Sequence, residues 1–317
     1  MTGTTGARVG LRRGLACTWV GPEAVQIGLS GRFGVQVHGL AAADARLISR
    51  LAKARPVRPQ RLEPQGRRLL QLLDRAGVLE RVENGTAAAE PVGDAAVWSL
   101  VHGSPDGGHR LLAHRAGLRV EVRGRGQLVD DVLRTLSGAG IGTVERVRGR
   151  AHLGLNRPDL VVLVEPGVAD APATDVLVSA DVAHLSVVVR EAEVLVGPLV
   201  VPGDGPCLRC LDLHRTDRDG VWPRTVEQLL AERSRRPAAW CVEETALSTL
   251  GAGLAAVQVL TFLDGRALDG VGPPAARGAT LEVTLPDGLA ARRPWGVHPR
   301  CGCTRLPGVP GARARAE

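Results

Sequence analysis

The first part of the chain combines short β-rich runs with helical periodicity. Two runs, Ala24–Leu29 and Phe33–His38, lie either side of a Ser-Gly pair and predict a hairpin. Apolar residues at helical spacing then predict helices over Leu40–Ala54 and Gln65–Ala76. Another β-rich run, Val78–Val82, follows the second helix. Strands and helices that close on a β wing are the pattern of a winged helix-turn-helix.

Beyond residue 97 the hydrophobic pattern changes to an alternation of strands and helices. The run Leu160–Val164 is continuously apolar, as buried parallel strands are. This alternation predicts an α/β fold with a doubly wound, Rossmann-type sheet. The predicted strands are Leu118–Arg123, Thr143–Val147, Leu160–Val164, Asp175–Ser179, Leu185–Val189, Val194–Val201 and Thr280–Leu285, and the predicted helices are Gln127–Ala139, Thr225–Arg236 and Cys241–Leu263.

A linker separates the two patterns. Residues 83–95 are small and polar and include Pro and Gly, which is typical of a connecting segment. We therefore expect a winged-helix-like domain over 1–90 and an α/β domain over 91–306. The last residues, 307–317, are rich in Gly, Pro and Arg and are expected to form a disordered tail.

Composition and charge narrow the classes of function. Hydrophobic residues make up 44% and charged residues 23% of the chain, which indicates a globular protein and excludes a collagen or a coiled coil. Five Trp, two Phe and no Tyr leave few rings on which single-stranded nucleic acid would stack. Residues 1–90 carry 14 basic and 7 acidic side chains, whereas the rest carries 26 of each. An anionic partner should therefore meet the first domain, unless these arginines only solvate its surface.

The chain is expected to be cytoplasmic. Residues 1–16 lack the apolar stretch and cleavage site of a secretory signal. The longest apolar run, Ala246–Leu263, contains Ser, Thr, Gln and Gly, so we expect a buried core helix and no membrane span. In a reducing compartment, paired cysteines are first interpreted as metal ligands. Two others, Cys17 and Cys241, are expected to be packed free thiols.

Four cysteines form two closely spaced pairs. Cys207 and Cys210 stand in a CxxC turn, and Cys301 and Cys303 in a CxC turn whose central glycine permits the tighter backbone. Two such turns predict a tetrahedral four-cysteine site suited to structural Zn²⁺, with no open position for a catalytic water. The alternatives are a redox-active CxxC and buried free thiols.

A glycine loop follows the first strand of the α/β domain. Gly124 and Gly126 stand where such folds bind a phosphate on backbone N–H groups at a helix N-terminus. The third glycine of the GxGxxG pattern is replaced by Val129, which would crowd the helix against the strand. After the second strand stands Arg148 instead of an acidic residue that would bind a ribose. The loop is typical of a degenerate nucleotide site, and ATP binding is not expected.

The α/β part, roughly residues 97–306, resembles the ThiF/MoeB-like, ubiquitin-activating-enzyme-like proteins. The segments Val196–Gly203, Pro206–Asp219 and Trp295–Cys303 are more specific, and are similar to the divergent branch found in thiazole/oxazole-modified microcin (TOMM) clusters. That resemblance implies a cyclodehydratase-associated protein that binds a precursor leader peptide. It also implies that the N-terminal region is a peptide-recognition element.

The resemblance implies a scaffold and not an enzyme. Active members of the broad family adenylate a carboxylate with a full glycine loop, an acidic residue, an Asn/Arg pair, a lysine and a magnesium-binding aspartate. Here the only lysine, Lys53, lies in the other domain, and arginine does not reproduce its compact charge. The divergent branch presents its peptide to a separate YcaO-type partner, which activates the amide with ATP.

We expect an acidic leader peptide to add as a strand to the winged-helix sheet. The candidate contacts are Val35 and Val37 on the second strand of the hairpin, and Arg67, Arg68 and Arg75 on the second helix, of which Arg68 and Arg75 share a face. The alternative is that these arginines only solubilise the helix. The α/β domain would dock a partner or a second copy of itself as a homodimer.

Two rival functions belong to other classes. A basic winged helix-turn-helix is typical of DNA-binding proteins. Against this, the expected recognition helix, Gln65–Ala76, offers three Arg and no Asn, and no dedicated dimerisation helix is evident. The other rival is an active adenylyltransferase that takes its missing groups from a partner subunit. Pyrophosphate exchange and salt-dependent duplex binding distinguish these rivals from the scaffold.

Overall fold

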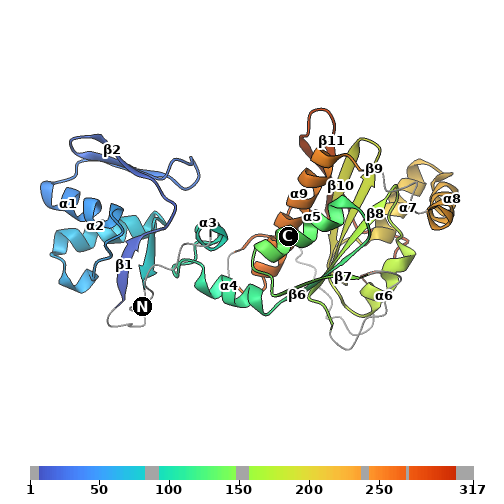
Figure 1. Cartoon of the computed structure of the whole chain (residues 1–317), viewed down its shortest axis with the longest axis horizontal. Coiled ribbons are helices and arrows are strands. Elements are labelled where there is room, and N and C mark those ends of the chain that lie inside the picture. The colour runs from blue at the N-terminus through green and yellow to red at the C-terminus, as the bar shows by residue number, and fades with distance from the viewer. Residues whose placement is uncertain (1–6, 83–92, 148–156, 237–242, 269–270, 305–317) are drawn as a thin grey trace. The chain divides into compact units, whose positions relative to one another are not determined.

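The computed structural model divides into two compact units, Met1–Ala113 and His114–Glu317 (Figure 1). Each unit has its own sheet and its own hydrophobic core. The structure describes residues 7–82, 93–147, 157–236, 243–268 and 271–304.

The first unit combines a three-stranded antiparallel sheet, a two-stranded ribbon and short helices. The sheet has the order β2-β3-β4, and the ribbon pairs β1 with β5. Its elements are β1 (Arg8–Leu11), β2 (Cys17–Gly21), β3 (Ala24–Ile27), β4 (Val35–Val37), α1 (Ala42–Ala52), the 3-10 turn Pro59–Arg61, α2 (Pro64–Arg75), β5 (Leu79–Val82), α3 (Gly93–Val101) and the first part of α4 (His109–Ala116), whose last three residues belong to the second unit.

The core of this unit lies between the sheet and the two helices α1 and α2. Val25 and Ile27 of β3 are fully buried, because the central strand turns one face toward the helices. The predicted hairpin, both helices and the β5 strand are confirmed. The buried partners from the helices are Leu47, Ile48 and Leu51 of α1 and Leu69, Leu70 and Leu73 of α2.

A buried arginine fastens α3 to the first unit. Arg12 donates from Nε to the Gly77 carbonyl at 2.6 Å, and from Nη1 to the carbonyls of Ser99 and Ser104 at 3.1 and 2.5 Å. Burial lowers the pKa of Arg12, and the nearby Glu80 carboxylate opposes that shift. These bonds place the α3 segment in the same compact unit as the strands before it.

The second unit is built on a seven-stranded mixed sheet of order β12-β11-β10-β9-β8-β6-β7. The strands β7, β6, β8 and β9 run parallel, and β9 to β12 pair antiparallel. The elements are β6 (Arg119–Arg123), α5 (Gln127–Gly138), β7 (Thr143–Val147), β8 (Leu160–Pro166), the 3-10 turn Pro172–Thr174, α6 (Asp175–Ser179), β9 (His184–Arg190), β10 (Glu193–Val200), α7 (Leu208–Arg218), α8 (Trp222–Arg235), α9 (Thr245–Asp264), β11 (Ala279–Thr284) and β12 (Ala290–Pro294).

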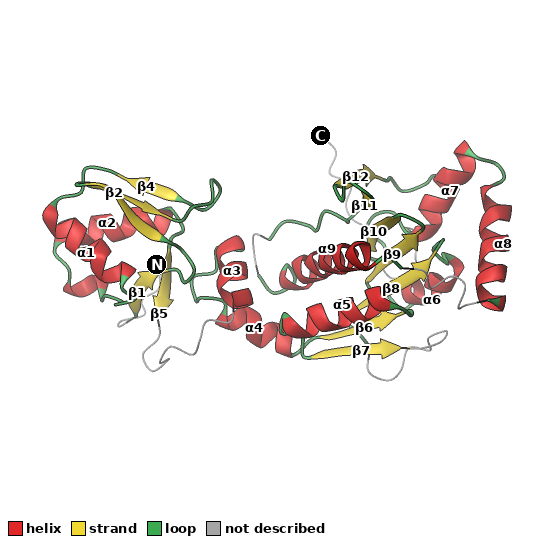
Figure 2. Cartoon of the chain, turned by 45° about the horizontal axis from the view of Figure 1, so that its top comes forward, coloured by secondary structure: helices red, strands yellow, loops and turns green. Residues whose placement is uncertain are grey.

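Helices cover both faces of this sheet, as the predicted α/β fold requires (Figure 2). On one face, α9 approaches β10 so closely that Gly251 lies against Val194. On the other face, Val188 and Leu195 pack with Leu208 of α7. The alternation of side chains along β9 and β10 separates the two layers. The longest predicted apolar run is α9, which by length and composition could cross a membrane but has 56% of its most apolar window buried.

One predicted strand, Asp175–Ser179, is wrong. The segment forms the short helix α6, which follows a 3-10 turn and begins with Asp175 in its first turn. Its Leu177 is fully buried against Val161 and Val182, whereas Val176 is 45% exposed. A run of β-branched residues this short takes the conformation that buries its one core side chain.

Several elements were not predicted: β1, β2, α3 and α4 of the first unit, and α7 and β12 of the second. The helix α3 begins at Gly93, inside the predicted linker 83–95, and α9 begins later than expected. The helix α7 follows the first cysteine pair, and β12 is an edge strand with every residue exposed, so it has no apolar alternation. The helix α9 begins at Thr245 because the Glu244 carboxylate accepts from the N–H groups of Ala246 and Leu247. Cys241 lies outside the described residues.

Candidate metal centre, glycine loop and peptide edge

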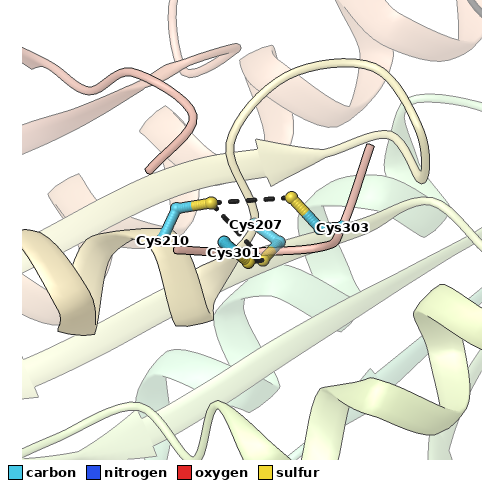
Figure 3. Close-up of side chains that lie close together, drawn as sticks. All are labelled: Cys207, Cys210, Cys301 and Cys303. Atoms are coloured by element: carbon cyan, nitrogen blue, oxygen red, sulfur yellow. Dashed lines mark hydrogen bonds between the residues drawn. The ribbon is translucent and has the colours of Figure 1, made fainter. Parts of the chain in front are cut away.

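The four predicted cysteine ligands converge at one end of α7 (Figure 3). Cys207 precedes the first residue of α7 and Cys210 lies in its first turn. Cys301 and Cys303 follow β12, about ninety residues later. Three of the four are buried, and Cys303 is half-buried.

The sulfur positions fit a tetrahedral metal site. All four Sγ atoms lie within 4.8 Å of one another. The Sγ atom of Cys207 is 3.8 Å from that of Cys210 and 3.6 Å from that of Cys301, and the Cys210–Cys303 distance is 3.5 Å. Zn–S bonds of about 2.3 Å in a tetrahedron place the sulfurs about 3.8 Å apart, whereas a disulfide needs about 2.05 Å. The four thiols can therefore hold a metal ion.

Hydrogen bonds among the thiols polarise the cluster. The Cys207 thiol donates to Cys210 Sγ, which lowers the pKa of Cys210 to about 4 and raises that of Cys207. The backbone N–H of His298 also donates to Cys210 and favours its thiolate. Burial raises the pKa of Cys303 to about 12. Cysteine binds a metal as the thiolate, so metal binding at this cluster would release protons.

Aromatic and cationic side chains join α7 to the segment that carries the second pair. Arg215 and Arg218 lie over the Trp295 ring, at 5.7 and 5.6 Å from its centroid. Trp295 Nε1 donates to Thr280 Oγ1 of β11 at 3.0 Å. The buried His298 ring bonds Asp217 of α7 through Nε2 at 2.7 Å. Contacts outside the sulfur cluster therefore also bring the two cysteine pairs together.

The glycine loop connects β6 to α5. Gly124 and Gly126 have φ values of +140° and +98°, which favour glycine. A Cβ at Gly124 would lie 3.0 Å from Val164 Cβ and 3.1 Å from Val129 Cγ2. Val129, in the place of the third glycine, is fully buried and fills the space between helix and strand. Arg148 lies outside the described residues, and Lys53 ends α1 in the first unit.

A carboxylate that was not predicted as a site residue, that of Glu243, lies against this loop. Glu243 Oε2 accepts from the Leu128 backbone N–H at 2.8 Å, in the first turn of α5. A Cβ at Gly126 would lie 2.7 Å from the Glu243 carboxyl carbon. Ser248 Oγ, in the first turn of α9, also donates to Oε2 at 3.4 Å. Its only signal in the sequence is the pair Glu243-Glu244 before an apolar helix, because the contact with α5 spans 115 residues.

The predicted peptide contacts divide into buried and exposed groups. Val35 and Val37 are half-buried and pack against the core that α2 shares, so β4 offers its backbone more than these side chains. The strand lies at the edge of its sheet and pairs with β3 on one side. The arginines Arg67, Arg68 and Arg75 are exposed on α2.

Leu72 lies at the surface, which the sequence pattern did not predict. Its neighbours Leu69, Leu70 and Leu73 are buried, but Leu72 is 60% exposed. Positions 68, 72 and 75 are spaced to share one helical face, so Leu72 lies between Arg68 and Arg75. This face of α2 therefore presents one apolar side chain between two guanidinium groups.

No family model matches the sequence, and no curated protein gives a significant match. Solved structures match the fold. The heterocyclase TruD has a TM-score of 0.67 and 16% identity over 94% of this chain and 43% of its own. E. coli MccB with selenomethionyl MccA has a TM-score of 0.64 and 13% identity over 94% of this chain and 100% of its own. This chain has the fold of MccB and of the matching part of TruD.

These matches confirm the Rossmann-like α/β fold that the resemblance implied for the second unit. A heterocyclase in complex with substrate and cofactor also matches, with a TM-score of 0.63 and 14% identity over 90% of this chain and 38% of that one. The chain thus spans less than half of each heterocyclase and nearly the whole of MccB. MccB has been solved with MccA and with ATP.

Proposed function

We propose that this chain is a non-catalytic, leader-peptide-binding scaffold of a ribosomal-peptide modification system of the TOMM type. It presents an acidic precursor peptide to a YcaO-type cyclodehydratase in the cytoplasm. The observation that carries the proposal is the shared fold, over both units, with a heterocyclase and with MccB, which has been solved with MccA. The presence of both units in one chain supports peptide recognition together with scaffolding.

The first unit supplies a surface for β-strand addition. In this proposal the winged-helix-like unit extends its sheet β2-β3-β4 by a strand of peptide beside β4. The backbone of Val35–Val37 gives main-chain hydrogen bonds, while Arg68, Leu72 and Arg75 of α2 contact the peptide side chains. Arg67 has a local role as well, because its Nη1 donates to the Leu62 carbonyl at 2.5 Å.

The second unit supplies the scaffold, with Zn²⁺ as its structural metal. Cys207, Cys210, Cys301 and Cys303 would hold the ion with four sulfurs, which leaves no open position for a water or substrate. When bound, the ion joins α7 to the segment after β12. This unit would also dock the cyclodehydratase or a second copy of the chain.

Peptide binding can be tested by fluorescence anisotropy with a labelled peptide of alternating Glu and Leu residues. We expect saturable binding that weakens with salt, and roughly tenfold weaker binding for Leu72→Asp. Arg68→Glu should weaken binding several-fold, whereas Arg50→Glu, the same charge change on an exposed position of α1, should leave it within about twofold. Equal losses for both arginine variants would reduce the effect to net charge and refute the surface.

Hydrogen exchange locates the peptide independently of affinity. Added peptide should slow exchange of the backbone amides in β4 and leave those of β1 unchanged, because strand addition protects the edge that it pairs with. Protection confined to the second unit would contradict the proposal.

The alternative function is ATP-dependent adenylation, which the likeness to ATP-bound MccB favours. Pyrophosphate exchange decides between the two. The scaffold predicts no exchange with ATP and Mg²⁺ in the presence of the peptide, since Val129 fills the loop and Lys53 lies in the first unit. Exchange above the background of a Gly126→Asp variant would make the chain an enzyme.

A further inference from the structure

We propose that the glycine loop is an anion site whose ligand is this chain's own Glu243 carboxylate. In doubly wound folds the loop after the first strand presents backbone N–H groups to a phosphate. Here the Leu128 N–H, in the first turn of the helix that follows the loop, donates to a side chain that precedes α9. The inference concerns the second unit and does not depend on peptide binding.

The contacts of Glu243 are those of a bound anion. Its Oε2 accepts a 2.8 Å hydrogen bond from the Leu128 N–H, an orphan donor of the first turn of α5. The positive end of the α5 dipole favours a negative charge at this place. Ser248, which is 1% exposed, adds a second donor to the same oxygen.

The backbone of the loop is shaped for this carboxylate. Gly126 has φ +98°, and a Cβ there would lie 2.7 Å from Glu243 Cδ. In a dinucleotide site the second glycine allows the backbone to approach a pyrophosphate. In this chain the same glycine allows the approach of Glu243, so its presence needs no nucleotide.

A charged side chain of the protein also occupies the carboxyl end of the neighbouring strand β8. Arg233 of α8 donates from Nη1 to the carbonyls of Pro166 and Val168, at 3.1 and 2.8 Å, and from Nη2 to Glu165 at 3.1 Å. Burial raises the pKa of Glu165, and Arg233 opposes that shift. Ligands of open α/β sheets bind outside the carboxyl ends of the strands. At two of these ends the chain's own charged groups take that position.

The Glu243 carboxylate also connects α9 to α5. Glu243 joins the N-terminus of α5 to the first turn of α9, and the two helices lie on the same face of the sheet (Figure 2). The next residue, Glu244, caps α9 itself through Ala246 and Leu247. Two adjacent carboxylates thus satisfy the N-termini of two helices.

Inorganic phosphate and the variant Glu243→Ala test the inference in the full-length chain. We expect thermal unfolding of the wild-type chain to be insensitive to phosphate at constant ionic strength. Glu243→Ala should unfold at a lower temperature and regain stability with phosphate in a saturable manner, because the freed Leu128 N–H can donate to a phosphate oxygen. Glu244→Ala is the matched control: it also frees backbone N–H groups, at the N-terminus of α9, but the residues before that helix include no glycine loop, so it should not respond to phosphate.

Hydrogen exchange of the Leu128 amide gives a second readout. It is measured in Glu243→Ala and in the milder variant Glu243→Gln. The amide should lose about tenfold in protection in Glu243→Ala and less in Glu243→Gln, whose side-chain oxygen can still accept. Phosphate-dependent stabilisation of the wild-type chain equal to that of Glu243→Ala would overturn the inference. Unchanged Leu128 protection in both variants, or no phosphate response in Glu243→Ala, would also overturn it.

Discussion

The buried ion pair between Arg115 and Asp264 provides the sharpest test of how the second unit is held together. Both side chains are 0% exposed. Arg115 Nε donates to Asp264 Oδ1 at 2.9 Å and Nη2 donates to Oδ2 at 2.5 Å, so the pair is bidentate. Arg115 Nη1 also donates to the Ala139 carbonyl at 3.0 Å, after the last residue of α5. The pair therefore fastens the last residue of α9 and the C-terminus of α5 to the chain just before β6.

Asp264→Asn removes the negative charge and keeps the shape of the side chain. A buried guanidinium then loses the counter-charge that it binds, which costs about 3–5 kcal/mol of the free energy of unfolding. For a unit of about 200 residues this loss lowers the unfolding temperature by roughly 10 °C. Replacing both partners, Arg115→Met with Asp264→Leu, should restore most of the loss, because both charges of the pair then leave the interior.

Urea unfolding followed by circular dichroism measures these free energies. The control is Arg235→Gln, which breaks the exposed pair between Arg235 and Glu232 at 3.3 Å and should change the free energy by no more than about 0.5 kcal/mol. A loss below about 1 kcal/mol in Asp264→Asn would refute the reasoning. So would a double variant less stable than Asp264→Asn alone, since the cost would then come from lost packing.

Three other predictions concern pH, the metal and the packing of α9. Burial lowers the pKa of His184 to about 4, against about 6.5 in the unfolded chain. The unfolded chain thus binds the proton first, so stability is complete above about pH 6.5, falls by about 3 kcal/mol toward pH 4, and His184→Gln should flatten this slope in urea unfolding. Purified chain should carry one Zn²⁺ by metal analysis, and Cys301→Ser should abolish it and lower the unfolding temperature; retention of the metal would contradict the site. Gly251→Ala should destabilise by about 1–3 kcal/mol, because its Cβ would lie 2.9 Å from a β10 side chain, whereas Gly253→Ala, with open space around it, should stabilise by up to about 1 kcal/mol; equal effects in calorimetry would exclude the packing argument.

Much of the fold could be predicted from local pattern. The alternation of β-rich and helical segments indicated the α/β class, and the CxxC and CxC turns indicated four cysteines that the structure brings within 4.8 Å. These signals succeed because they depend on residues close in sequence. The strand predicted over Asp175–Ser179 was wrong because local pattern does not contain the deciding contact. The segment is helical because Leu177 is buried against Val161.

Position within a helix face was harder to predict for α2. The periodicity of Leu69, Leu70, Leu72 and Leu73 indicated an apolar face, but four leucines in five positions exceed the width of one buried stripe. Only the packing of α2 on its core decides that Leu72 is the exposed member. The half-buried state of Val35 and Val37 has the same origin.

The sequence by itself determined the α/β class of the second unit, the glycine loop with its missing third glycine, and the four candidate metal ligands. Each of these features depends only on residue types and on spacings of a few residues. Only the tertiary structure decided what meets across long separations in the chain: the thiols of α7 with those after β12, Arg115 with Asp264, and Glu243 with the loop before α5. Side chains more than ninety residues apart leave no periodic signal, and their contact is fixed by how the helices pack on the sheet.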